Sequence, residues 1–298
     1  MKRLIVIGGA TATGKTAMAI RLAQYLNTEI VSADSRQFYR EMSIGTAKPH
    51  AQELAAARHH FIDRFSVGEP YSVGDFERDA LQTIADIFQH SEYAILVGGS
   101  GLYLRAVCEG LDVFPEISTS TRNQVDNGYQ AYGLSWLQQQ ILELDPAYAQ
   151  QVDLQNPARL RRAIEVCLQS GTTYSSFRTQ QKTSRPFQVI QILLELPRQE
   201  LYLRIDERVD EMIKAGLEAE ALALYASRDF PALKTVGYEE FFDYFDGKCS
   251  LEEAIELIKQ HSRNYAKRQV TWFKKHGDWH AFHPSDFAGI VKLISEMG

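Results

Sequence analysis

A run of small, hydroxyl and glycine residues near the amino terminus carries the clearest chemical signal in the chain, Gly9-Ala10-Thr11-Ala12-Thr13-Gly14-Lys15-Thr16. It matches G-x-x-x-x-G-K-[ST], the phosphate loop, whose backbone N–H groups and following helix N-terminus surround an anion. Lys15 adds a positive charge for the bridging oxygens, and the Thr16 hydroxyl is a ligand for Mg²⁺. The motif therefore predicts binding of a di- or triphosphate, with Mg²⁺ as cofactor and Thr16 on the metal.

The segments that flank this loop predict the fold that positions it. Residues 4–7 are a β-branched apolar run that predicts a buried parallel strand, and residues 16–25 predict a helix that begins at the loop's end. Further short apolar runs predict strands at 29–31, 59–63, 93–97 and 187–194. We therefore predict an α/β fold, a P-loop core with a parallel sheet.

Polar residues follow two of these predicted strands directly. Asp34, Ser35 and Gln37 come after the second strand, and Gly98-Gly99-Ser100 follows the strand at 93–97. The carboxyl ends of parallel strands form the ligand crevice of such a sheet, so we expect these side chains to face the phosphate loop. Two alternatives stay open, because Asp34 or Ser35 could cap a helix and the glycines could serve a tight turn.

Composition limits the class of protein. The chain has 298 residues, an apolar content of 45% and a formal net charge of −6, which is typical of a globular enzyme and argues against nucleic-acid binding by the whole surface. No apolar run has the length of a membrane span, and the first residues lack the pattern of a signal peptide. Three scattered cysteines indicate reduced thiols, so we expect a cytoplasmic protein, and nothing requires more than a monomer.

The character of the sequence changes in the middle of the chain. Residues 112–186 hold no apolar strand run, and residues 134–144 and 157–169 have helical spacing, the second after Asn156-Pro157. We predict three parts: a first part of the core at 1–111, a helical insertion at 112–186, and core completion with C-terminal helices at 187–298. The insertion should present a basic face made of Arg159, Arg161, Arg162, Arg178, Lys182 and Arg185.

The C-terminal helix predicted at 251–276 is basic in its second half. Arg263, Lys267 and Arg268 alternate with aromatic residues, a pattern that suits a nucleic-acid surface. Lys274 and Lys275 fit better as cations that stabilise the helix C-terminus.

Several stretches, in chain order, resemble one family, the tRNA dimethylallyltransferases (tRNA isopentenyl transferases). The matching residues are 9–16, 32–39, 44–49, 59–63, 96–99, 159–166, 234–238 and 265–272. The resemblance implies a P-loop core similar to nucleotide kinases, with a helical insertion that grips the tRNA anticodon stem-loop. It also implies transfer of a dimethylallyl group from dimethylallyl diphosphate to N6 of adenosine 37, in tRNAs that read codons beginning with U.

The resemblance assigns roles to particular residues. Asp34 matches the carboxylate that takes a proton from the adenine amine, while Lys15, Thr16 with Mg²⁺, and Arg204 would stabilise the departing diphosphate. The target base must be flipped out of the anticodon loop. The residues expected to contact this base or the RNA are Asp34, Ser35, Gln37, Ser100, Arg159, Arg162, Arg263, Lys267, Arg268 and Gln269.

Some positions depart from the family pattern, and three other functions stay open. Ala10 and Thr13 replace a proline and a serine of the loop, Ser100 replaces a threonine, and Glu239 stands where a basic residue is usual, so the 234–238 corner is not assigned to the RNA. Arg204 and Arg208 share a helix face and could simply be solvated. The rival functions are an adenylate isopentenyltransferase that makes a cytokinin, a small-molecule P-loop kinase, and a P-loop RNA-binding protein without turnover.

Overall fold

The computed structural model describes residues 1–179 and 181–297. The chain forms two compact units: the first combines Met1–Glu109 with Ser184–Gly298, and the second is Gly110–Thr183. Each unit has a hydrophobic core of its own. Among the described residues, no helix has both the length and the apolar content needed to cross a membrane.

The first unit is built on a parallel sheet of six strands in the order β3-β2-β4-β1-β5-β6. The central strand β1 (Arg3–Gly9) lies between β4 (Tyr93–Val97) and β5 (Gln188–Leu194), and Arg3 is opposite Tyr93 and Gln188. The remaining strands are β2 (Ile30–Ser32), β3 (His59–His60) and β6 (His280–Phe282).

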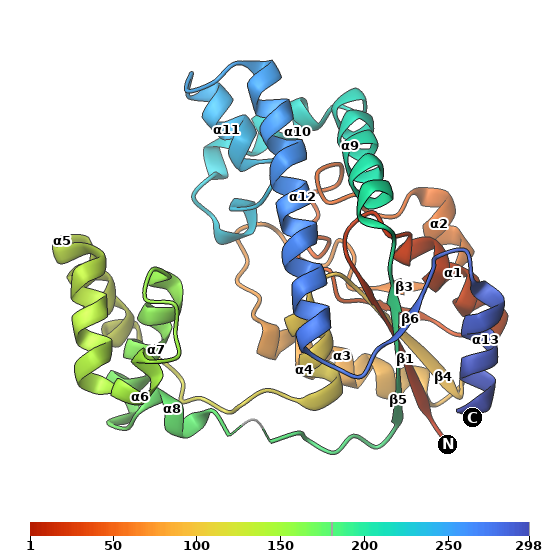
Figure 1. Ribbon diagram of the computed structural model, residues 1–298, viewed down its shortest axis with the longest axis horizontal. Coiled ribbons are helices and arrows are strands. Elements are labelled where there is room, and N and C mark those ends of the chain that lie inside the picture. Colours follow the sequence, from red (N-terminus) through yellow and green to blue (C-terminus); the bar gives the residue numbers. More distant parts are fainter. Residues whose placement is uncertain (180, 298) are drawn as a thin grey trace. The chain divides into compact units, whose positions relative to one another are not determined.

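Helices cover both faces of this sheet (Figure 1). Because side chains alternate along a strand, Ile5 and Ile7 point to one face of β1, and Leu4 and Val6 to the other. Helices α1 (Lys15–Leu26) and α13 (Phe287–Glu296) pack on the Ile5 face. The Leu4 face is covered by α3 (Val73–Ile87), α4 (Gly101–Glu109) and α12 (Leu251–Lys275).

The first unit contains further helices besides these. They are α2 (Ala51–Ala56), α9 (Arg198–Lys214), α10 (Leu217–Leu224) and α11 (Glu239–Phe245), with single 3₁₀ turns at Tyr225–Ser227 and Pro231–Leu233. Ser250 and Glu253 form a capping box that begins α12.

The predicted α/β fold with a parallel sheet is confirmed. The strand β6 was not predicted, because His280–Phe282 is short and mostly exposed and so has no apolar signature. The strand predicted at 59–63 is too long, since only His59 and His60 pair with β2.

The second unit is helical. It contains α5 (Thr119–Leu144), which bends at Gly133 where φ is 71°, followed by α6 (Pro146–Ala149), α7 (Pro157–Ser170) and α8 (Tyr174–Phe177). Asn156 caps α7 as its sequence predicts, and Asp145 is fully buried, where it accepts hydrogen bonds from Tyr148 and Ser175.

One residue assigned to the basic face of the insertion lies elsewhere. Arg185 belongs to the first unit, where its guanidinium binds the Glu77 carboxylate at 2.6 Å and the backbone carbonyls of Ala106 and Val107. Its side chain is only 10% exposed. Arg185 therefore anchors α4 to α3, and its charge is paired with Glu77 instead of being available to RNA.

Candidate functional site

The phosphate loop connects β1 to α1 and has the backbone shape its motif predicts. Gly14, at φ 82°, is the residue before α1, and no side chain of the described residues caps that helix. Gly9 cannot carry a side chain, because an added Cβ would lie 2.8 Å from the Leu194 carbonyl and from Thr13 Oγ1. The first-turn N–H groups of α1 are thus available to an anion.

Two cations and one carboxylate surround this loop. Lys15 Nζ donates to the Ala10 carbonyl at 2.6 Å, and Arg208 Nη1 donates to Thr11 Oγ1 at 3.2 Å. The pKa of Lys15 is lowered to about 8, mainly by burial and then by the neighbouring Arg208, while Asp34 partly opposes both effects. The ammonium is therefore poised to regain its full charge when an anion arrives.

We expect diphosphate binding to take up a proton at Lys15. At pH 8 this lysine is about half charged, and a bound anion raises its pKa, so about half a proton enters per complex. Calorimetry of magnesium pyrophosphate binding in buffers of different ionisation enthalpy measures this uptake. Since arginine stays charged, the Lys15→Arg variant should show no such proton uptake. Equal proton uptake by the wild-type protein and the variant would contradict the assignment of this uptake to Lys15. Affinity should fall as the pH rises above 8.

The residues predicted at the strand ends meet in one crevice beside the loop. Asp34, Ser35, Gln37 and the Gly99 backbone line it. Its other walls include Thr11, Lys15, Thr16, Gly45, Thr46, Ala47, Arg208, Gly237, Tyr265 and Gln269. A second, outer pocket shares Lys15, Thr16 and Arg208 with this crevice and adds Lys48, Arg204 and Glu207. The phosphate loop therefore lines both pockets.

Asp34 has one free carboxylate oxygen in this crevice. Its Oδ1 accepts a hydrogen bond of 3.0 Å from the Arg36 backbone N–H, which closes an Asx turn. Its Oδ2 accepts none from the residues that the structure describes. No helix begins at Asp34 or Ser35, so the helix-cap alternative is wrong.

Gln37 lines the same crevice as this carboxylate, and Ser100 lies beside Ser35 of the crevice. The Gln37 amide nitrogen donates to the carbonyls of Thr46 and Ala47 at 3.2 and 3.3 Å, and its Oε1 accepts a long bond from the Ser32 hydroxyl at 3.4 Å. Ser100 Oγ lies 3.4 Å from Ser35 Oγ. Gln37 is thus oriented by the protein with an acceptor oxygen that retains bonding capacity.

Gln269 is placed differently from the RNA contact that its position suggested. Its side chain is buried, accepts from the Thr11 backbone N–H at 2.9 Å and donates to the Gly99 carbonyl at 2.9 Å. It therefore joins α12 to the phosphate loop and to the loop after β4.

We expect Gln269→Met to lower the free energy of unfolding by about 2 kcal/mol, because the Thr11 N–H and the Gly99 carbonyl lose their partner inside the protein. Urea denaturation measures this change. Lys267→Met, on the exposed side of the same helix, is the control and should cost less than about 0.5 kcal/mol. If Gln269→Met left the free energy of unfolding unchanged and weakened RNA binding, Gln269 would be an RNA contact as first predicted.

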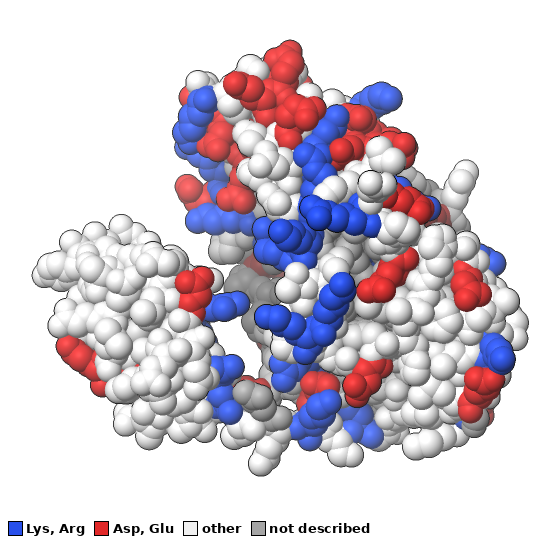
Figure 2. Space-filling model, in the orientation of Figure 1, with Lys and Arg blue, Asp and Glu red and all other residues white. Residues whose placement is uncertain are grey.

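The three cations predicted on α12 have different surroundings. Arg263 forms an ion pair with Asp206 on α9, so its charge is already neutralised within the protein. Lys267 is exposed, and the Arg268 guanidinium lies 5.7 Å from the centre of the Tyr265 ring. In Figure 2, lysine and arginine side chains gather on the surface over α12.

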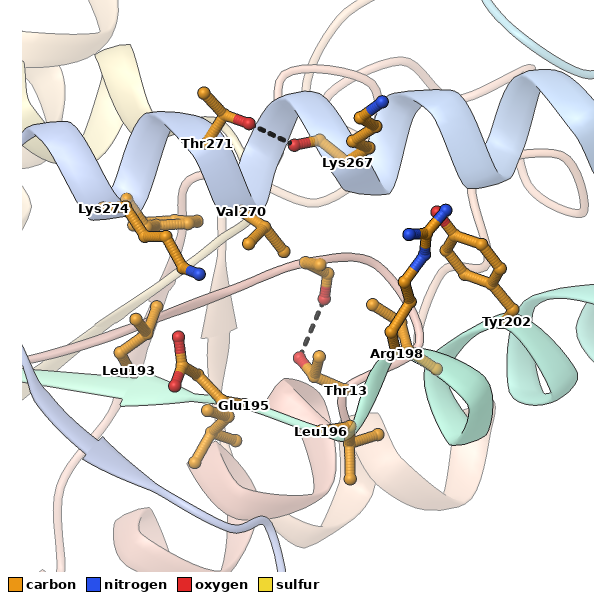
Figure 3. Close-up of a pocket in the computed structure, with 14 residues that line it drawn as sticks. Thr13, Leu193, Glu195, Leu196, Arg198, Tyr202, Lys267, Val270, Thr271 and Lys274 are labelled. Carbon is orange, nitrogen blue, oxygen red and sulfur yellow. Dashed lines mark hydrogen bonds between the residues drawn. The ribbon is translucent and has the colours of Figure 1, made fainter.

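A further pocket lies on the other side of α12 from the crevice, between α12, α9 and the end of β5 (Figure 3). Lys267 and Lys274 line it from α12, and Arg198, 5.1 Å from the centre of the Tyr202 ring, lines it from α9. Thr13 lies at its base and bonds back to the Ala10 carbonyl. Basic side chains thus extend beyond the predicted Lys267.

Arg204, which is predicted to be catalytic, and Arg208 have different surroundings in the structure. The Arg204 side chain is 41% exposed and pairs with Glu200, and it lines the outer pocket but not the crevice. Arg208, which the spacing left as a solvated residue, instead lines both pockets and contacts the phosphate loop. Only the packing of α9 against the loop could distinguish the two.

The second unit presents two of its predicted cations on the surface. Arg159 and Arg162 of α7 are exposed, and the Arg162 guanidinium lies 5.7 Å from the Phe114 ring centre. Arg161 instead pairs with Asp126, and Arg178 lies over the Tyr148 ring.

The chemistry of the crevice suits Mg²⁺ that arrives with a phosphate ligand. Thr16 and Asp34 offer one hydroxyl and one carboxylate, and no group of three or more His, Cys, Asp or Glu side chains in the described residues could hold a metal by itself. Mg²⁺ is commonly held by few protein groups together with substrate phosphates, so these residues fit it.

Comparison with known proteins gives consistent matches. The family model for IPP transferase matches residues 37–276. A tRNA dimethylallyltransferase of Flavobacterium johnsoniae is 49% identical over 99% of this chain and 98% of its own length, and one from Christiangramia forsetii is 49% identical over 91% and 90%.

Solved structures agree with these matches. The full-length tRNA isopentenylpyrophosphate transferase of Bacillus halodurans has a TM-score of 0.73 and 36% identity, covering 100% of this chain and 95% of its own. A eukaryotic dimethylallyltransferase solved acting on tRNA has a TM-score of 0.81 and 27% identity, covering 97% of this chain and 75% of its own.

Proposed function

Since the chain belongs to the tRNA dimethylallyltransferase family, we propose that its crevice joins a prenyl diphosphate on the phosphate loop to an adenine base beside Asp34. The enzyme transfers a dimethylallyl group to adenosine 37 of tRNA. The observation that supports this use of the site is the shared crevice, in which an unpaired carboxylate oxygen and the phosphate loop face one cavity.

The reaction needs a carboxylate because an exocyclic adenine amine is a weak nucleophile. In our proposal the amine nitrogen attacks the first carbon of the dimethylallyl group, the bond from that carbon to the diphosphate oxygen breaks, and the amine proton passes to Asp34. Gln37, Ser35 and Ser100 hold the flipped base, with Gln37 Oε1 as an acceptor for its amine.

Departure of diphosphate develops negative charge at the phosphate loop. Lys15, Arg208 and the N–H groups that begin α1 stabilise that charge, and Arg204 approaches it from the outer pocket. Mg²⁺, held by the diphosphate together with Thr16, would neutralise part of the leaving group's charge. Cytoplasmic location and a monomeric state stay predictions.

One transfer experiment tests the function against its rivals. Radiolabelled dimethylallyl diphosphate and Mg²⁺ are offered with an anticodon stem-loop that carries adenosines at 36 to 38, or with free AMP. We expect label only on the stem-loop, lost when adenosine 37 is replaced. Label on AMP would indicate a cytokinin-forming enzyme. Phosphate transfer from ATP would indicate a kinase. Binding of the stem-loop without transfer of label would indicate a protein that only recognises RNA.

We expect Lys267 and Arg268 to contact RNA phosphates, with Arg159 and Arg162 of the second unit in the same role. Replacing Lys267 and Arg268 by glutamine should raise the tRNA dissociation constant and reduce the slope of log K against log salt by about 0.7 to 0.9 per lost contact. Filter binding across a salt series measures it. Arg263→Gln is the control, because its charge is paired with Asp206. An unchanged slope for the double variant would remove both residues from the RNA surface.

A further inference from the structure

A carboxylate outside the crevice holds one of the crevice's walls in place. Glu220 on α10 accepts hydrogen bonds from three consecutive backbone N–H groups: those of Ser43 and Ile44 on Oε2, at 3.0 and 2.8 Å, and that of Gly45 on Oε1, at 3.0 Å. Successive N–H groups that converge in this way form an anion nest, and bonds to a charged acceptor are stronger than neutral ones. Glu220 does not line the crevice itself.

The fourth bond to this carboxylate comes from Tyr238, in the 234–238 corner that is not assigned to the RNA. Tyr238 is fully buried and its hydroxyl donates to Glu220 Oε1 at 2.7 Å. Its ring also explains Gly45, since a Cβ there would lie 2.7 Å from Tyr238 ring atoms. Glu240 holds this corner by accepting from the Gly237 N–H at 2.7 Å.

The loop that Glu220 binds, residues 43–47, also orients Gln37. The carbonyls of Thr46 and Ala47, directly after the three gripped N–H groups, accept both bonds of the Gln37 amide nitrogen. With the nitrogen directed at the loop, Oε1 is left as the acceptor. A shift of this loop would let the Gln37 amide turn or move.

We propose that Glu220 is a positioning residue for prenyl transfer: through the 43–47 loop it fixes the Gln37 amide, and thereby the target adenine, relative to Asp34. This inference rests on the proposed function, because it takes Gln37 as a contact of the base. Glu220 touches neither substrate and acts only through the loop.

The first test replaces the carboxylate with its neutral isostere. Glu220→Gln places an amide NH₂ against backbone N–H donors, so the loop loses at least one of its three bonds to this side chain. We expect kcat for the stem-loop to fall about tenfold, less than a full 1 Å misplacement costs, with KM for dimethylallyl diphosphate within about twofold. Glu218→Gln on the same helix is the control and should leave kcat unchanged.

A double-mutant cycle separates positioning from a loss of stability. If Glu220 acts through Gln37, then adding Glu220→Gln to Gln37→Ala should lower kcat by less than about twofold, because the path is already broken. An equal tenfold loss in both backgrounds, or an unchanged kcat in the single variant, would overturn the inference. Thermal unfolding of each variant confirms that the rates describe folded protein.

The outcome is distinguishable from failure of the proposed function. Wild-type enzyme that transfers label to the stem-loop, together with an additive cycle, would overturn only the role of Glu220. Wild-type enzyme that leaves the stem-loop unlabelled would overturn the function and this inference together.

Discussion

Asp34→Asn should lower the rate of prenyl transfer by about 100-fold or more, the scale of a lost, positioned general base. Asparagine retains an Oδ1 that accepts from the Arg36 N–H, so the Asx turn survives while the basic oxygen is lost. Single-turnover rates with prebound stem-loop measure the chemical step directly, and the tRNA dissociation constant should change little.

A second substitution at the same position checks that result. Asp34→Ala removes the turn bond as well and should be at least as slow as Asp34→Asn, with lower thermal stability. If Asp34→Asn retained its single-turnover rate and instead lost tRNA affinity, the carboxylate would be a recognition group and not the base.

Local sequence predicted the parts of the site that belong to one continuous segment. The phosphate loop is such a segment, because Gly9, Gly14 and Lys15 act within one strand–loop–helix unit. Asp34 followed from a general rule for parallel sheets, since it is the second residue after the end of β2. The α/β fold was predictable for the same reason, as its central strands are continuous apolar runs.

The missed parts depend on contacts between distant segments. Gln269 and Thr11 are 258 positions apart, and nothing in the composition of α12 distinguishes a glutamine that holds the phosphate loop from one that faces RNA. Glu220 lies 175 to 177 positions from the N–H groups it binds. Helical spacing placed Arg204 and Arg208 on one face without saying which of them the fold brings to the loop.

The difference between these two arginines has a large expected effect on catalysis. Arg208→Met should lower the single-turnover rate by about 100- to 1000-fold, because a half-buried cation that faces the developing diphosphate charge is lost. Arg204→Met is the matched control, one helical turn away, and should cost less than about tenfold, since its side chain is 41% exposed and paired with Glu200. A larger loss for Arg204→Met than for Arg208→Met would reverse the assignment.

The same substitution should change the titration of the phosphate loop. Because Arg208 lowers the pKa of Lys15, its removal should raise that pKa above its value of about 8. Proton uptake on pyrophosphate binding at pH 8 should then shrink, even though the affinity falls. If uptake stayed the same in Arg208→Met, the two cations would not share one anion site. Reduced uptake together with a slow chemical step would place both on the leaving diphosphate, which is where prenyl transfer requires positive charge.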